Sequence, residues 1–104
     1  MEKLNECMER NTIVTTKTIK NDMETCGEFA EIVGECLKKH FSNDFGTLGE
    51  MDIKMNLAAL KSGLKNDRVL SRYETNYGNI YIISELYSNK DYDIVTTVMY
   101  CDEY

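Results

Sequence analysis

Four glutamates in the first half of the chain recur at helical spacing. They are Glu24, Glu28, Glu31 and Glu35. Residues three and four apart are neighbours on a helix surface, so this pattern predicts a row of carboxylates along one face. Such a row can imitate the phosphates of a nucleic-acid strand and occupy the basic groove of a protein that handles DNA or RNA. An ordinary solvated helix face, relieved by Lys38 and Lys39 at its far end, would explain the same pattern.

A second group of residues could carry catalysis. His40, the only histidine, is close in sequence to Asp44 and Asp52, and a histidine beside carboxylates can act as a general base at neutral pH. With Arg68 these residues would form a small catalytic or ligand-binding site between helices and sheet. A histidine near a helix C-terminus more commonly bonds a free carbonyl or packs beneath the next loop. No common catalytic or nucleotide-binding motif occurs, and we expect a protein that is not an enzyme.

The cysteines do not predict a metal site. Cys7, Cys26, Cys36 and Cys101 are far apart and contain no C-x-x-C pair. A single histidine does not complete a common zinc pattern, so we expect neither metal nor cofactor. Cys36 falls among apolar helix positions and predicts a small buried side chain. The first ten residues lack a signal-peptide core, which predicts a cytoplasmic protein with free thiols.

Tyrosines are concentrated in the second half of the chain. Tyrosine buries much area at little cost in entropy, which favours a protein-binding surface, although it is also a common strand residue. We predict a partner-binding surface that joins the glutamate row to Tyr73, Tyr81, Tyr87, Tyr92, Asp91 and Asp93.

Two helices must position the first group. Thr25 to Glu28 and Thr47 to Glu50 each match the T-x-x-E capping box, which predicts helices over 25–41 and 48–62. The first has an apolar stripe at the helical period. The second would bury Met51, Met55, Ala58 and Ala59 and end at Gly63.

Four segments are rich in strand-forming residues: 12–16, 69–75, 79–85 and 94–100. A tight-turn composition at 76–79 predicts a hairpin between the second and third. Ile80 and Ile82 would share one face, and Tyr81, Ile83 and Glu85 the other. The fold class is therefore α+β: an antiparallel sheet of three to four strands packed against two main helices. We expect a single domain over 1–104, with residues 1–10 frayed or disordered.

The charge of the chain indicates the kind of partner. There are 18 acidic and 12 basic residues among 104, a formal charge of -6. A nucleic-acid groove needs a basic face, so we expect no direct nucleic-acid binding and a protein partner with a basic surface. No apolar run is long enough to cross a bilayer, and we expect no membrane partner.

Several of these segments, taken in order, resemble a known family. The chain is similar to H-x-x-G-D-W-G at residues 40–46 and to N-x-x-A-L-x-x-G-x-R-L-L-S-x-Y at 56–63 and 68–73. It is similar to I-I-T-E at 82–85 and to T-T-V-L-F-P-x-E-Y at 96–104. These motifs mark a small bacterial family on plasmids, integrative elements and phages. The resemblance covers roughly 11–104, with Asn43, Phe45, Ser84 and Cys101 as departures.

The resemblance implies a genomic setting. It does not imply any particular enzymatic activity. Such elements carry genes against restriction and CRISPR systems, so we expect an acidic inhibitor of a host nucleic-acid-directed defence complex, of the anti-CRISPR or antirestriction type, acting by protein contact as a monomer or small homo-oligomer. The alternatives are the small enzyme described above and a regulatory or antitoxin-like module that dimerises through an edge strand.

Overall fold

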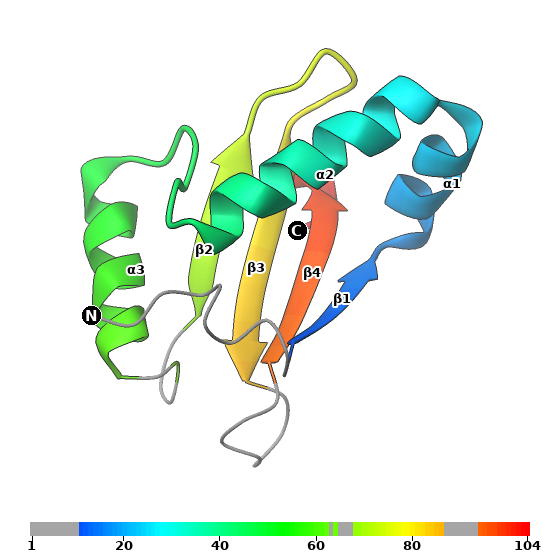
Figure 1. The fold of residues 1–104 in the computed structure, drawn as a ribbon. Helices are drawn as coiled ribbons and strands as arrows, with labels where there is room; N and C mark the ends of the chain where they lie inside the picture. The colour runs from blue at the N-terminus through cyan, green and yellow to red at the C-terminus, as the bar shows by residue number, and fades with distance from the viewer. Residues whose placement is uncertain (1–10, 63, 65–67, 87–93) are drawn as a thin grey trace.

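The computed structural model describes residues 11–62, 64, 68–86 and 94–104 (Figure 1). These residues form an α+β fold. Its elements are β1 (Asn11–Thr15), α1 (Lys17–Thr25), α2 (Gly27–Phe41), α3 (Glu50–Lys61), β2 (Val69–Tyr73), β3 (Ile80–Leu86), β4 (Ile94–Tyr100) and a short 3-10 helix, η2 (Cys101–Glu103). The predicted strands and both main helices are confirmed to within two residues at each end. The predictions for residues 1–10, and for Gly63 as a helix stop, lie outside the described residues.

The sheet is mixed, so the predicted antiparallel arrangement holds for three of its four described strands. Its strand order is β1-β4-β3-β2. β2, β3 and β4 are antiparallel neighbours as predicted, but β1 pairs in parallel with β4. Local turn chemistry predicts hairpins between strands close in sequence, and it carries no information about a pairing between the two ends of the chain.

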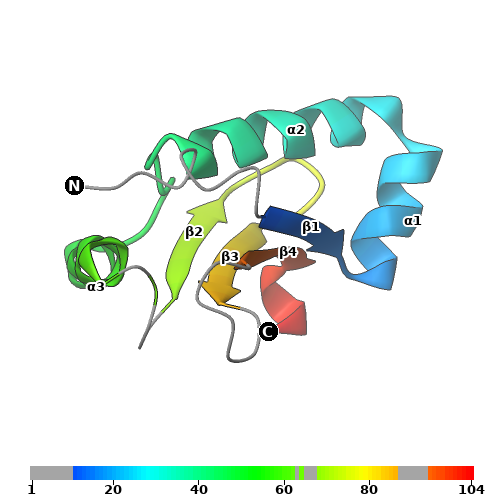
Figure 2. The ribbon, with the colours of Figure 1, turned by 60° about the horizontal axis from the view of Figure 1, so that its bottom comes forward.

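The helices cover one face of the sheet. Figure 2 shows α1 and α2 on one side and η2 on the other, while α3 lies beside β2. α2 faces the sheet with Phe29, Val33, Cys36, His40 and Phe41. Cys36 is buried, as predicted. Ile80 and Ile82 face the helices, and Tyr81, Ile83 and Glu85 alternate to the other face, which confirms the predicted alternation.

The predicted helix caps are wrong. Thr25 belongs to α1, and its hydroxyl donates to the carbonyl of Asn21 rather than capping α2. The hydroxyl of Thr47 donates to the carbonyl of Arg72, and Gly49 is the N-cap of α3. The threonine that does cap a helix is Thr16, which accepts from the N–H of Ile19. A threonine hydroxyl bonds whichever backbone group the tertiary structure brings near it, so the motif alone does not place the helix start.

The predicted apolar face of α3 is also wrong. Met51 is 75% exposed and Met55 is 51% exposed, whereas Asn56, Ala59 and Leu60 are buried. α3 lies along the edge of the sheet rather than over its face, and therefore buries only a narrow stripe.

Two apolar clusters fill the space between sheet and helices. One joins α3 to the ends of β2 and β4 through Phe41, Phe45, Ala59, Leu60, Leu64, Val69 and Ile94. The other joins α1 and α2 to the middle of the sheet through Ile19, Phe29, Val33, Cys36, Tyr73, Ile80, Ile82 and Val98. Phe45 packs in the core, as predicted.

Four buried polar side chains lie between the two clusters: His40, Ser71, Ser84 and Thr96. We call them the polar seam. Nδ1 of His40 lies 2.6 Å from Oγ of Ser71, and Nε2 lies 2.8 Å from Oγ of Ser84. Oγ of Ser84 lies 2.7 Å from Oγ1 of Thr96. All four are 0% exposed. The seam links α2 to β2, β3 and β4.

The seam suits a neutral imidazole. Both ring nitrogens contact hydroxyls, which can donate to one nitrogen and accept from the other. Burial lowers the pKa of His40 from 6.5 to about 3, because a charged ring would lose its hydration.

The depressed pKa predicts acid sensitivity. In the unfolded chain His40 becomes protonated as pH falls below its usual pKa of 6.5. In the folded protein it becomes protonated only near its lowered pKa of about 3. Stability is therefore lost as pH falls through this window, by up to about 1.4 kcal/mol per pH unit. Denaturant unfolding between pH 7 and 5 measures the slope, and His40→Gln should flatten it.

Equal slopes in both proteins would contradict this prediction. A second measurement does not depend on the variant folding. The chain has one histidine, so the imidazole ring proton resonances of the folded protein belong to His40, and their chemical shifts should not change between pH 8 and 5.

The β2 edge of the sheet is closed by polar contacts. The side-chain amide of Asn56 on α3 accepts from the N–H of Leu70 at 3.0 Å and donates to its carbonyl at 2.6 Å. The N–H of Arg72 donates to the carbonyl of Phe45, and the N–H of Thr47 donates to the carbonyl of Arg72. The outward backbone groups of Leu70 and Arg72 are thus satisfied without another strand.

We predict that Asn56→Ala destabilises the fold by about 1–3 kcal/mol, because it leaves the backbone groups of Leu70 without partners. Met55→Ala, one residue away and exposed, should change stability by less than about 0.5 kcal/mol. Denaturant unfolding compares the two. Similar losses in both variants would show that the Asn56 contacts do not stabilise the edge.

Candidate functional site

The predicted glutamate row is divided between two helices. Glu28, Glu31 and Glu35 lie on α2 and are exposed, opposite its buried stripe. Glu24 is exposed too, but it lies in the last turn of α1, before the chain turns at Cys26. Because of this break the row on α2 has three carboxylates. The predicted helix over 25–41 did not include the break. We call Glu28, Glu31 and Glu35 the α2 glutamate row.

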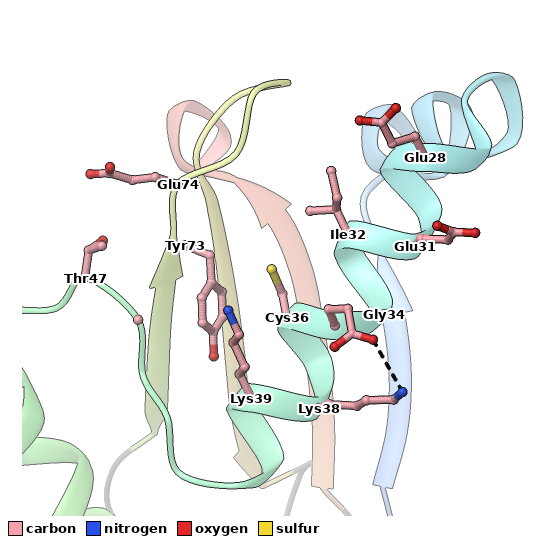
Figure 3. A pocket seen from close by; sticks show the side chains of 12 residues that line it. Glu28, Glu31, Ile32, Gly34, Cys36, Lys38, Lys39, Thr47, Tyr73 and Glu74 are labelled. Carbon is pink, nitrogen blue, oxygen red and sulfur yellow. Dashed lines mark hydrogen bonds and ion pairs between the residues drawn. The ribbon is translucent and has the colours of Figure 1, made fainter.

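A groove of about 770 Å³ runs beside this row. Figure 3 shows it between α2, the segment at Thr47 and the end of β2. The lining includes the α2 glutamate row, and the apolar lining comes from Ile32, Cys36 and Tyr73. Glu74 lies across the groove from α2 (Figure 3). The groove is not apparent from the sequence, because Glu74 is far from α2 along the chain and the loop that holds Thr47 has to fold back beside the helix.

The charges along the groove change sign from one end to the other. The α2 glutamate row begins at the N-terminal turn of α2, and Lys38 and Lys39 lie in its last turn. The carboxylate of Glu35 pairs with the ammonium group of Lys38 at 3.5 Å, with both side chains exposed. Exposed pairs of this kind contribute little stability, so both groups can exchange this pairing for a partner at small cost.

Tyr73 does not lie on the exposed surface that the sequence predicted. It is 5% exposed on the helix-facing side of β2, and its hydroxyl donates to the carbonyl of Asp44. Burial raises its pKa well above the usual value. Tyr73 therefore supports the inner wall of the groove and offers a partner little area.

The other predicted residues lie elsewhere. Tyr81 is half-buried on the opposite sheet face, where the ring of Tyr104 packs edge-on against it with centroids 5.5 Å apart. The guanidinium of Arg68 lies over the Tyr104 ring, 5.3 Å from its centroid. Tyr87, Tyr92, Asp91 and Asp93 lie outside the described residues.

The residues of the predicted catalytic site are not gathered. His40 is held in the polar seam by Ser71 and Ser84, and neither of its ring nitrogens bonds a carbonyl, which was one of the two structural roles considered for it. Asp44 accepts from the N–H of Gly46 and turns the chain, as predicted for its role in a turn. Asp52 is exposed on α3. With both of its ring nitrogens bonded to buried hydroxyls, His40 is not available to a substrate as a general base.

Cys26 is a feature that sequence analysis missed. It is the N-cap of α2, and its Sγ lies 3.5 Å from the hydroxyl oxygen of Tyr77. The Tyr77 hydroxyl lowers the pKa of this thiol because it can donate to the thiolate, and the backbone N–H of Phe29 acts in the same direction. The same contact raises the pKa of Tyr77 to about 12. Burial raises the pKa of Cys36 and of Cys101.

Two further findings concern the described part of the chain. It contains no group of three or more His, Cys, Asp or Glu side chains placed to hold a metal ion. None of its helices combines the length and apolar character needed to cross a membrane.

Comparisons of the chain with protein-family models, with curated proteins and with solved structures found no match.

The contrast among the described cysteines predicts selective modification. At pH 8, iodoacetamide should alkylate Cys26 before Cys36 and Cys101, since only Cys26 has a lowered pKa. Tyr77→Phe should slow the reaction of Cys26, on the order of threefold, by removing the hydroxyl. Peptide mass spectrometry gives the rate at each site, with Cys101 in the same sample as the internal control. Faster alkylation of Cys36 or Cys101 would contradict this prediction.

Proposed function

We propose that this protein is a non-catalytic inhibitor, encoded on a mobile genetic element, that binds the basic surface of a host nucleic-acid-directed defence complex in the cytoplasm. The complex would be a CRISPR effector or a restriction enzyme, and inhibition would occur by occupation of a nucleic-acid-binding surface.

The α2 glutamate row beside the groove is the observation that carries this proposal. Three exposed carboxylates on a rigid helix present negative charge at a fixed spacing. The groove adds apolar area from Ile32, which is half-buried and which a partner side chain can cover. Charge would steer the encounter, and burial of the apolar wall would slow dissociation.

The overall charge supports a protein partner. A formal charge of -6 repels nucleic acid and favours the basic grooves that defence enzymes use to hold DNA or RNA. The resemblance to a family carried on plasmids, integrative elements and phages supplies the biological setting. The burial of His40 and the exposure of Asp52 on α3 support binding rather than catalysis.

A charge-reversal experiment tests the proposal. Cells that carry a CRISPR or restriction system are challenged with a targeted phage, with and without the protein. The wild-type protein should restore plating in at least one system. Glu28→Lys, Glu31→Lys and Glu35→Lys together should abolish the restoration. The purified triple variant should bind the complex at least about tenfold more weakly, which corresponds to about 1.4 kcal/mol.

A matched control separates local from overall charge. Asp52→Lys, Glu85→Lys and Asp102→Lys change the net charge by the same amount at exposed positions on other elements, and this variant should retain most of the inhibition. Wild-type binding should also weaken as salt rises, because exposed charges are screened. Equal loss in both triple variants, or unchanged inhibition by the α2 variant, would exclude the row as the binding surface. Absence of protection in every system tested would contradict the proposed function.

A further inference from the structure

The two edges of the sheet differ in whether their outward backbone groups have hydrogen-bond partners among the described residues. At the β2 edge, Asn56, Phe45 and Thr47 bond the outward backbone groups of Leu70 and Arg72. At the opposite edge, β1 has β4 as its neighbour on one side, and no other strand of the described residues pairs with its outer side (Figure 1). An open strand edge is a template for pairing with another chain.

The backbone groups that β1 presents at this edge follow from its pairing with β4. The N–H of Thr16 donates to the carbonyl of Val98, so Thr16 directs its backbone groups inward. N–H and C=O groups alternate in direction along a strand. The backbone N–H and C=O groups of Val14 and Thr12 therefore also point toward β4, whereas those of Ile13 and Thr15 point outward. The outward set repeats every second residue and is centred on Ile13.

The side chains along this edge do not protect it. Ile13 is 45% exposed and Val14 is 40% exposed. β1 reads Asn-Thr-Ile-Val-Thr, with neither charge nor proline. Natural edge strands are commonly blunted by lysine, proline or a bulge. β1 instead combines β-branched residues of high strand propensity with exposed apolar area.

We propose that β1 pairs antiparallel with β1 of a second copy of this chain, about a two-fold axis at Ile13, so that the two sheets become one continuous sheet. In this register Ile13 lies opposite the partner's Ile13 and exchanges both backbone hydrogen bonds with it. Thr12 lies opposite the partner's Val14, and Asn11 opposite the partner's Thr15. All five residues of β1 are then paired, which no other register achieves.

The strand itself favours a second copy as the occupant. The register is self-complementary, as a two-fold interface requires. β1 brings no like charges together although each copy has a formal charge of -6. Exposed Ile13 would be covered by its own counterpart. Since the two acidic copies repel each other at long range, added salt should strengthen this dimer, which is opposite to the salt effect expected for binding to a basic partner.

Complementary charged variants test the pairing directly. Sedimentation velocity of the wild-type protein from micromolar to millimolar concentration should show a monomer–dimer equilibrium. Ile13→Glu and Ile13→Lys each place two like charges at the axis, and each should raise the dimer Kd at least tenfold. An equimolar mixture should form a mixed dimer with a Kd within about tenfold of the wild-type value, since opposite charges then face each other.

Met51→Glu and Met51→Lys serve as controls, because Met51 is 75% exposed on α3, at the far side of the sheet. They should dimerise as the wild-type protein does. Circular dichroism should show that all four variants are folded, as expected for exposed positions. A wild-type monomer at every concentration would overturn the proposal. So would Ile13 variants that still dimerise alone, or a mixture that does not recover dimerisation. None of these outcomes bears on the α2 glutamate row, so this inference and the proposed function fail separately.

Discussion

The hydrogen bonds that hold His40 between Ser71 and Ser84 are the constraint on which the rest of the fold depends. Apolar contacts alone would let a helix slide on a sheet at modest cost, because one methyl group can replace another. A buried polar group has no such freedom, since each unpaired donor or acceptor costs about 1–3 kcal/mol. The seam therefore specifies both where α2 lies and how β2 and β3 are aligned. Cys36 and Tyr73 lie on the same two elements as His40 and Ser71, so the groove inherits its shape from this alignment.

Most of the fold could be predicted because the elements are encoded locally. The alternation of buried and less buried side chains in β3 and the apolar stripe of α2 can be recognised from residues close together in sequence. The structure confirms both. The failures share one physical origin. Thr25 and Thr47 donate hydrogen bonds to backbone carbonyls, instead of accepting from a helix N–H as in a capping box. Met55 is exposed because α3 lies along the edge of the sheet. Each of these outcomes depends on structure outside the short motif: for Thr47 and Met55 on the position of another element, and for Thr25 on the continuation of α1.

The candidate site was predictable in its charges and not in its shape. Exposure of Glu28, Glu31 and Glu35 follows from their place opposite a buried stripe, and a helical pattern is enough to find it. The groove needs two further segments that fold back beside α2. Tyr73 illustrates the limit, because tyrosine suits a binding surface and a strand equally well, and only the face of the strand decides between them. Tyr73 lies on the helix-facing side of β2 and is therefore buried in the core.

The parallel pairing of β1 with β4 also affects how the protein is made. β1 is synthesised before the other described strands, and β4 after them. The hydroxyl of Thr16, just after β1, donates to the carboxylate of Glu103 at 2.9 Å, a second link between the two ends of the chain. The nascent polypeptide must therefore carry β1 without its neighbour until β4 has been made, and contacts between segments so far apart in sequence form slowly. A ribosome that stalls before β4 would release a chain with β3 as a bare strand edge, which makes incomplete copies natural substrates for chaperones and proteases.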